Sequence, residues 1–170
     1  MIIITAAECR QWIHDYRPDV SQQQATKDQI TLAYAVPKDS GVKTCLAHSV
    51  VAEMSFAQAG LLWITGWGIF PSAENRDLFE GYRKSLGEQR PLHVAPGHVF
   101  NDCDRSSVEA LLVLCFYFYW DVSLVEGDAG MIIKASHDEW VEVASADLSR
   151  RQRIEARFDK LGLKRLQGGN

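Results

Sequence analysis

The sequence predicts a single α+β or α/β domain with a mixed sheet of four or five strands, covered by about five helices. Helical and strand periods alternate in the first half of the chain. An apolar run of eleven residues, 110–120, has to lie inside a core. Two segments, 121–125 and 131–135, flank a glycine-containing turn and predict a hairpin. With 170 residues the chain has the size of one domain, so we expect residues 1–170 to fold as a unit.

The first helix is expected at residues 6–16. Thr5 and Glu8 stand at the spacing of a capping box, and Pro18 pushes the residue before it out of the helical region. Residues 19–28 have no apolar period, which predicts a surface connection.

A parallel β-α-β unit is expected next. Alternating apolar residues over 30–36 predict a strand, apolar residues three and four apart predict a helix between residue 42 and Gly60, and 61–65 forms a short buried strand. A strand, helix and strand in succession favour a crossover between parallel strands if both belong to one sheet.

The middle of the chain contains a helix and a loop. Ser72 is placed to cap a helix that runs to about Leu86, and Gly87 supplies its left-handed stop. Residues 88–100 show no period and are expected to form a loop.

The apolar run is expected to change from helix to strand. Ser106 and Glu109 have the capping-box spacing, and the aromatic residues that follow favour a strand over residues 117–121. The hairpin then forms an antiparallel pair, and residues 140–143 can add a third strand to give a meander.

The charge is unevenly distributed along the chain. Residues 148–170 hold seven basic and two acidic side chains, whereas the rest of the chain holds eleven and twenty. Apolar residues recur at helical spacing within 147–166, which predicts a basic amphipathic helix docked on an acidic body. A solvated helix face explains its cations better than a contact with nucleic acid, which we do not expect.

Composition also indicates the compartment. The four cysteines lack the spacing of a metal site and the density of a disulfide scaffold, and no basic segment precedes the N-terminal apolar residues. The longest apolar run is about half of the roughly 20 residues that span a membrane. We therefore expect a cytoplasmic protein without a membrane partner, a metal or another cofactor.

The polar cluster that follows residues 131–135 is the first candidate site. His137 stands beside Asp138 and Glu139, which suits a general base held by a carboxylate, and Trp140 follows directly. An exposed turn explains the same residues without chemistry, and we favour the turn.

Three other groups of residues are weaker candidates. His93 and His98 lie in the loop, but their spacing matches no closed zinc pattern. Trp67 stands between two glycines at a strand end, in a segment without a phosphate-binding motif, and is interpreted as a contact residue. Cys45 and His48 share one helix face, where we expect burial.

Two functions from different classes remain. The preferred one is a non-enzymatic protein-binding module, of the kind of small acidic immunity-type inhibitors, which holds a basic partner through Trp67, Asp138, Glu139 and Trp140. Its oligomeric state is left open.

The alternative is a small hydrolase or transferase with His137 or His98 as base. Asp138, Glu139 or Asp121 would then orient the imidazole. This alternative expects His98 and His137 to meet across one cleft.

Overall fold

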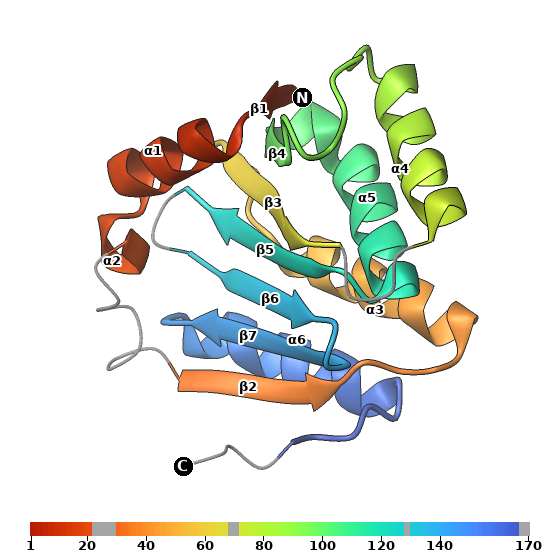
Figure 1. The fold of residues 1–170 in the computed structure, drawn as a ribbon. Helices are drawn as coiled ribbons and strands as arrows, with labels where there is room; N and C mark the ends of the chain where they lie inside the picture. Colours follow the sequence, from red (N-terminus) through yellow and green to blue (C-terminus); the bar gives the residue numbers. More distant parts are fainter. Residues whose placement is uncertain (22–29, 68–71, 128–129, 167–170) are drawn as a thin grey trace.

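A seven-stranded sheet forms the centre of the computed structural model, which describes residues 1–21, 30–67, 72–127 and 130–166. Within these residues the strand order is β1-β4-β3-β5-β6-β7-β2, and every neighbouring pair is antiparallel (Figure 1). The strands are β1 (Ile2–Ile4), β2 (Ile30–Ala35), β3 (Gly60–Gly66), β4 (Gly97–Phe100), β5 (Asp121–Glu126), β6 (Ile132–Ser136) and β7 (Trp140–Ser145).

The α+β class is confirmed, but the expected strand number and the parallel pair are wrong. β2 and β3 run in the same direction on either side of a helix, as the crossover requires. However, the three strands β5, β6 and β7 lie between them and supply their hydrogen bonds. β1 and β4 were missed because three and four residues are too few to show a strand period.

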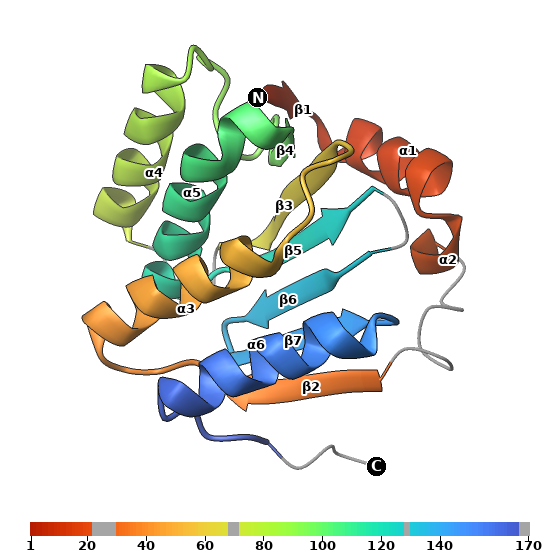
Figure 2. The same cartoon turned by 180° about the vertical axis from the view of Figure 1, so that it is seen from behind.

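Helices lie on both faces of the sheet (Figures 1 and 2). In the described residues they are α1 (Ala6–Tyr16), α2 (Pro18–Ser21), α3 (Ser40–Glu53), α4 (Ala73–Ser85), α5 (Arg105–Phe118) and α6 (Leu148–Lys160). The first face carries the main core under α3, α4, α5 and α6, whereas α1 and α2 pack on the second face. None of these helices combines the length and the apolar character that crossing a membrane requires.

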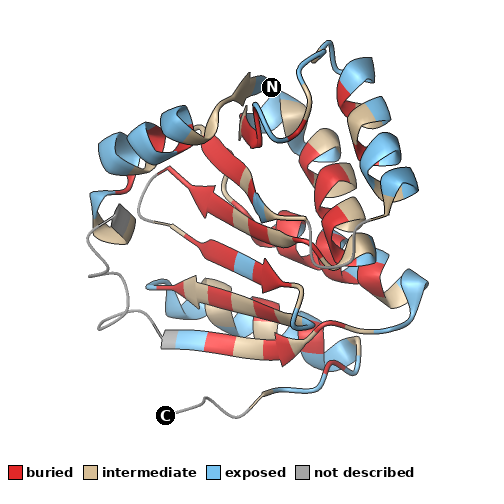
Figure 3. Ribbon diagram, viewed as in Figure 1, coloured by how far each residue is buried: buried red, intermediate tan, exposed pale blue. Residues whose placement is uncertain are grey.

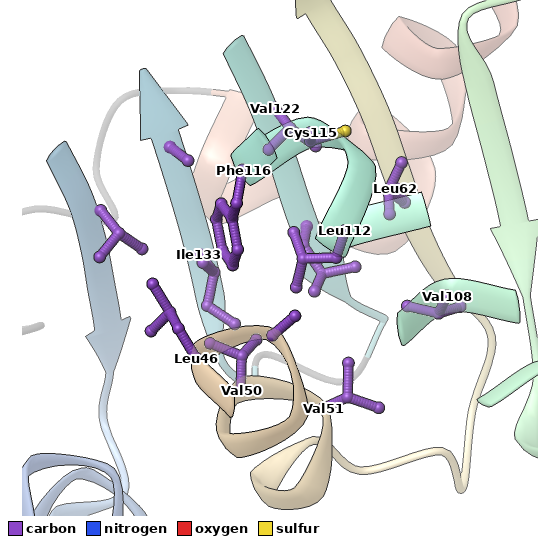
Figure 4. Packing of buried hydrophobic residues seen from close by; sticks show 14 of the residues in the cluster. Leu46, Val50, Val51, Leu62, Val108, Leu112, Cys115, Phe116, Val122 and Ile133 are labelled. Carbon is purple, nitrogen blue, oxygen red and sulfur yellow. The ribbon is translucent and has the colours of Figure 1, made fainter. Parts of the chain in front are cut away.

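Side-chain alternation along the strands separates two cores. In β3, Leu62 and Ile64 join the main core, whereas Leu61 belongs to a smaller cluster with Cys9 and Trp12 of α1. Figure 4 shows residues of α3 and α5 meeting those of β6 in the main core, and Figure 3 shows that burial is greatest along the central strands.

The helix boundaries follow local signals in most places. The capping box at Thr5, the Ser72 cap and the left-handed Gly87 (φ 92°) are confirmed. The box at Ser106 is wrong, because α5 begins at Arg105, after a short 3₁₀ turn over Asp102–Asp104.

The aromatic part of the apolar run is helical, so the expected strand over 117–121 is also wrong. α5 continues to Phe118 and ends at Tyr119, whose φ of 52° is left-handed; β5 begins at Asp121. Val108, Leu112 and the residues that follow on the same face are buried in the main core, and this packing overrides the strand preference of aromatic residues.

The basic C-terminal helix is docked by ion pairs that the sequence analysis did not anticipate. Arg150 pairs with the buried Glu126, and Arg153 and Arg157 both pair with Glu53 of α3. The expected helix over 147–166 ends at Lys160. The chain then runs beside β2, where the N–H of Ala35 donates to the Lys164 carbonyl (2.8 Å) and that of Leu166 donates to the Ala33 carbonyl (2.8 Å).

Candidate functional site

The candidate site lies on the part of the second sheet face that α1 and α2 leave uncovered among the described residues. These helices cover an apolar row formed by Leu61, Val125 and Ile132. Because alternate residues share a face, the next positions of the same strands bring polar and aromatic groups together. They are Trp63, Thr65, Asp121, Ser123, Lys134, Ser136, Trp140 and Glu142.

A shallow hollow of about 190 Å³ is formed where β3 ends, β5 begins and β6 turns into β7. It is smaller than the roughly 300–1,000 Å³ of a typical small-molecule pocket. Its lining includes Thr65, Asp121, Ser123, Lys134, Ser136 and Trp140. The hollow therefore suits a protruding side chain better than a whole metabolite.

The β6–β7 turn is fixed to the start of β5 by one carboxylate. The backbone N–H of His137 donates to Asp121 Oδ1 (2.8 Å), and its Nδ1 lies 2.8 Å from Oδ1 and 3.0 Å from Oδ2 of the same residue. A carboxylate on Nδ1 selects the imidazole tautomer that carries its proton there. Nε2 faces away, 3.4 Å from Asp138 Oδ1.

The acidic residues of this turn face outward. The Asp138 side chain is 71% exposed, and Glu139 is exposed with a left-handed φ of 62°. Ser136 is buried and fixes the turn, since its hydroxyl accepts the N–H of Asp138 (3.2 Å). The turn thus presents two carboxylates next to Trp140.

Trp67 lies apart from this group. Its side chain is half-buried and packs against the main core, on the other side of the sheet from the hollow. Its packing favours the role of covering the core over that of a contact residue. Residues 68–71 of the segment after Trp67 lie outside the described residues.

His98 is removed as a candidate base. Its side chain has no exposed surface, its Nδ1 lies 3.3 Å from the Leu62 carbonyl oxygen, and its ring meets Phe79 edge-on. Burial lowers the pKa of His98 to about 3, and the charge of Arg83 contributes. The expectation that His98 and His137 meet is wrong, because His98 points into the main core.

The remaining sequence candidates are dispersed. His93 is exposed in the loop before β4. Cys45 and His48 are both exposed, which corrects the expected burial, and His48 Nδ1 lies 3.3 Å from Glu109. α3 turns Leu46 and Val50 inward instead. No cluster of three or more His, Cys, Asp or Glu side chains suited to a metal ion is found in the described part of the chain.

Comparison with known proteins adds no assignment. No family model, no curated protein and no solved structure matches the chain.

Several residues of the site were missed by the sequence analysis. The signal for them was the alternation of polar and apolar residues around Ser123, Lys134 and Glu142, each flanked by side chains of the main core. That alternation shows which residues share a face, but the face itself exists only after β3, β5, β6 and β7 pair.

Replacing Gly66 by alanine is expected to break the contact between Asp121 and His137. A Cβ at Gly66 would lie 2.4 Å from Asp121 Oδ2, so the carboxylate has to move. We expect a loss of about 1–2 kcal/mol in the free energy of unfolding and a changed tautomer signal of His137 in ¹⁵N NMR spectra. The matched control is Gly81→Ala on α4, where an added Cβ meets nothing within 4 Å. An unchanged His137 spectrum in G66A would contradict this geometry.

Proposed function

We propose that the protein is a non-enzymatic cytoplasmic binding protein that holds a basic segment of a protein partner. The surface used is the uncovered part of the second sheet face, here named the acidic face. It consists of the hollow, Glu142 beside it, and Asp138 and Glu139 at its rim.

The observation that carries the proposal is the charge of this face. Asp121 and Lys134 line the hollow, and Glu142 is the cross-strand neighbour of Lys134. With Asp138 and Glu139 at the exposed turn, the described residues of this face include four carboxylates and one lysine. Such a surface attracts a cationic segment and disfavours nucleic acid, whose phosphates it repels.

Trp140 supplies the second element of recognition. Its ring is half-buried and lines the hollow, so an arginine or lysine side chain entering there can stack on it beside the carboxylates. Aromatic anchors of this kind contribute strongly to protein interfaces. The small volume of the hollow agrees with the entry of single side chains.

Neutralising the rim is expected to weaken this binding. In the variant Asp138→Asn/Glu139→Gln we expect about a tenfold lower affinity and a smaller salt dependence, because steering by charge is reduced. A partner is isolated from source cells on the wild-type protein at low salt, identified, purified and titrated against both proteins. The control variant Asp77→Asn/Asp102→Asn removes the same charge from exposed positions elsewhere. Equal binding by the rim variant, or a partner without a basic segment, would refute the proposal.

Hydrolysis or group transfer with His137 as base is the second candidate. It is favoured by the Asp121 contact on Nδ1, which leaves Nε2 available to take a proton. Nucleophilic catalysis also needs a hydroxyl or thiol at Nε2, and the contact seen there in the described residues is Asp138. Turnover of ester or phosphoester substrates that is abolished in His137→Gln, with partner binding retained, would favour this candidate.

A further inference from the structure

A second and larger hollow, here called the groove, lies between α3 and α6 in the helical layer on the first face of the sheet. Its volume of about 450 Å³ falls within the range of small-molecule pockets. The acidic face lies on the other side of the sheet, so this hollow does not belong to the site already described. Its lining is Ser49, Glu53, Arg153, Ala156, Arg157, Lys160 and Leu161.

A buried carboxylate holds two arginines side by side in this groove. Glu53 Oε2 accepts from Arg153 Nε (2.7 Å), and Oε1 accepts from Arg157 Nε (2.8 Å). Burial acts to raise the pKa of Glu53, but the two arginines outweigh it and keep the pKa below its ordinary value. Glu53 is therefore a fixed anion at neutral pH.

The outer edges of both arginines remain available. Each donates to Glu53 through Nε, and in the described part of the chain neither makes another side-chain hydrogen bond. The Arg153 side chain is 55% exposed and that of Arg157 is 43% exposed. Their terminal N–H groups are thus held in place and open to an anion, which is the arrangement that binds phosphate oxygens well.

The groove has an excess of positive charge and some apolar surface. Lys160 lies one turn after Arg157 and makes no ion pair among the described residues, so three cations face one carboxylate that is already used. Ala156 and Leu161 provide apolar surface beside these cations. The groove thus combines cations for a charged group with a surface for an apolar body.

We propose that this groove binds a phosphate-bearing small molecule, with Arg153, Arg157 and Lys160 on the phosphate and the apolar body against Ala156 and Leu161. The site is independent of the acidic face. It gives the arginines of α6 a second role beside helix docking.

Titration of the full chain with phenyl phosphate and with inorganic phosphate tests the site. Calorimetry and NMR monitor the binding. We expect saturable binding of phenyl phosphate at millimolar concentration or below, and weaker binding of inorganic phosphate because it lacks the apolar body. Lys160→Gln should lower the affinity for phenyl phosphate at least about tenfold. It should not lower Tm, since Lys160 makes no ion pair in the described residues.

The matched control is Arg151→Gln, which removes one positive charge from the same helix outside the groove. Its affinity for phenyl phosphate should stay within about twofold of wild type. Equal weakening in R151Q and K160Q would indicate attraction to the net charge of α6 and would overturn the proposal. Absence of saturable binding, or tighter binding of a single-stranded oligonucleotide that depends equally on Arg151, would also overturn it.

Discussion

Lowering the pH from 6.5 to 5 is expected to reduce the free energy of unfolding by roughly 1.5 kcal/mol through His98 alone. One full proton is worth about 1.4 kcal/mol per pH unit, and the unfolded imidazole is already half protonated at pH 6.5. Burial, reinforced by Arg83, lowers the pKa of His98 from 6.5 to about 3. The unfolded chain takes up this proton near pH 6.5 and the folded chain does not, so stability falls as the pH falls toward 3. Urea unfolding at several pH values measures the slope.

The replacement His98→Asn isolates this effect, because asparagine retains an N–H for the Leu62 carbonyl but does not titrate. We expect a lower stability at pH 7 and a flatter dependence between pH 6.5 and 5. His93→Asn, at an exposed position of the preceding loop, should keep the wild-type slope. An unchanged slope in H98N would show that another group takes up the proton.

Replacing Gly97 by alanine is expected to destabilise the protein by roughly 2–3 kcal/mol, as overpacking of a tight core does. A Cβ on Gly97 would lie 2.1 Å from Cys9 Sγ and 2.8 Å from Cγ1 of Ile4. Neither neighbour can move away easily, because Cys9 is buried on α1 and Ile4 pairs with Gly97 across β1 and β4. Chemical unfolding of G97A measures the loss.

A double variant tests the cause of this loss. Cys9→Ala removes the sulfur atom that the new methyl group would meet, so Cys9→Ala/Gly97→Ala should be more stable than the sum of the two single losses predicts. We expect at least half of the G97A loss to be recovered in this cycle. Strict additivity would place the strain elsewhere in the β4 strand.

The sequence predicts the helices and hairpin strands, which depend on neighbouring residues. It does not predict the strand order of the sheet, which depends on pairing between distant segments. The helix that begins after Thr5, the helix capped by Ser72 and the hairpin strands follow from capping and alternation within a few residues. The insertion of β5, β6 and β7 between β2 and β3 depends on which strand edges meet. No local period carries that information, so the parallel pair was predicted instead.

The residues of the candidate site could also be predicted only where they depend on the local sequence. Asp138, Glu139 and Trp140 were predicted as a polar break after a strand. The structure places Asp138 and Glu139 at an exposed turn and the half-buried Trp140 at the start of β7. Asp121 was one of three possible partners for the imidazole, and only the pairing of β5 with β6 brings it to His137.

His98 failed as a site residue because the four residues of β4 read as part of a proline-rich loop. A polar side chain in a loop is normally accessible, whereas β4 lies between β1 and β3 and carries His98 under α4. The arginines of α6 were assigned to solvent for a similar reason, because Glu53 is about one hundred residues away along the chain.

The course of residues 164–166 beside β2 also bears on self-association. An unpaired strand edge is a template on which a second chain can add its own strand, and repeated addition leads to polymers. Backbone hydrogen bonds from this segment occupy the outer side of β2 at Ala33 and Ala35. In the described part of the chain the opposite border of the sheet is β1, which offers only three residues. The addition of a second chain is thus limited at both borders. At β2 residues 164–166 occupy the outer edge, and at β1 the strand is only three residues long.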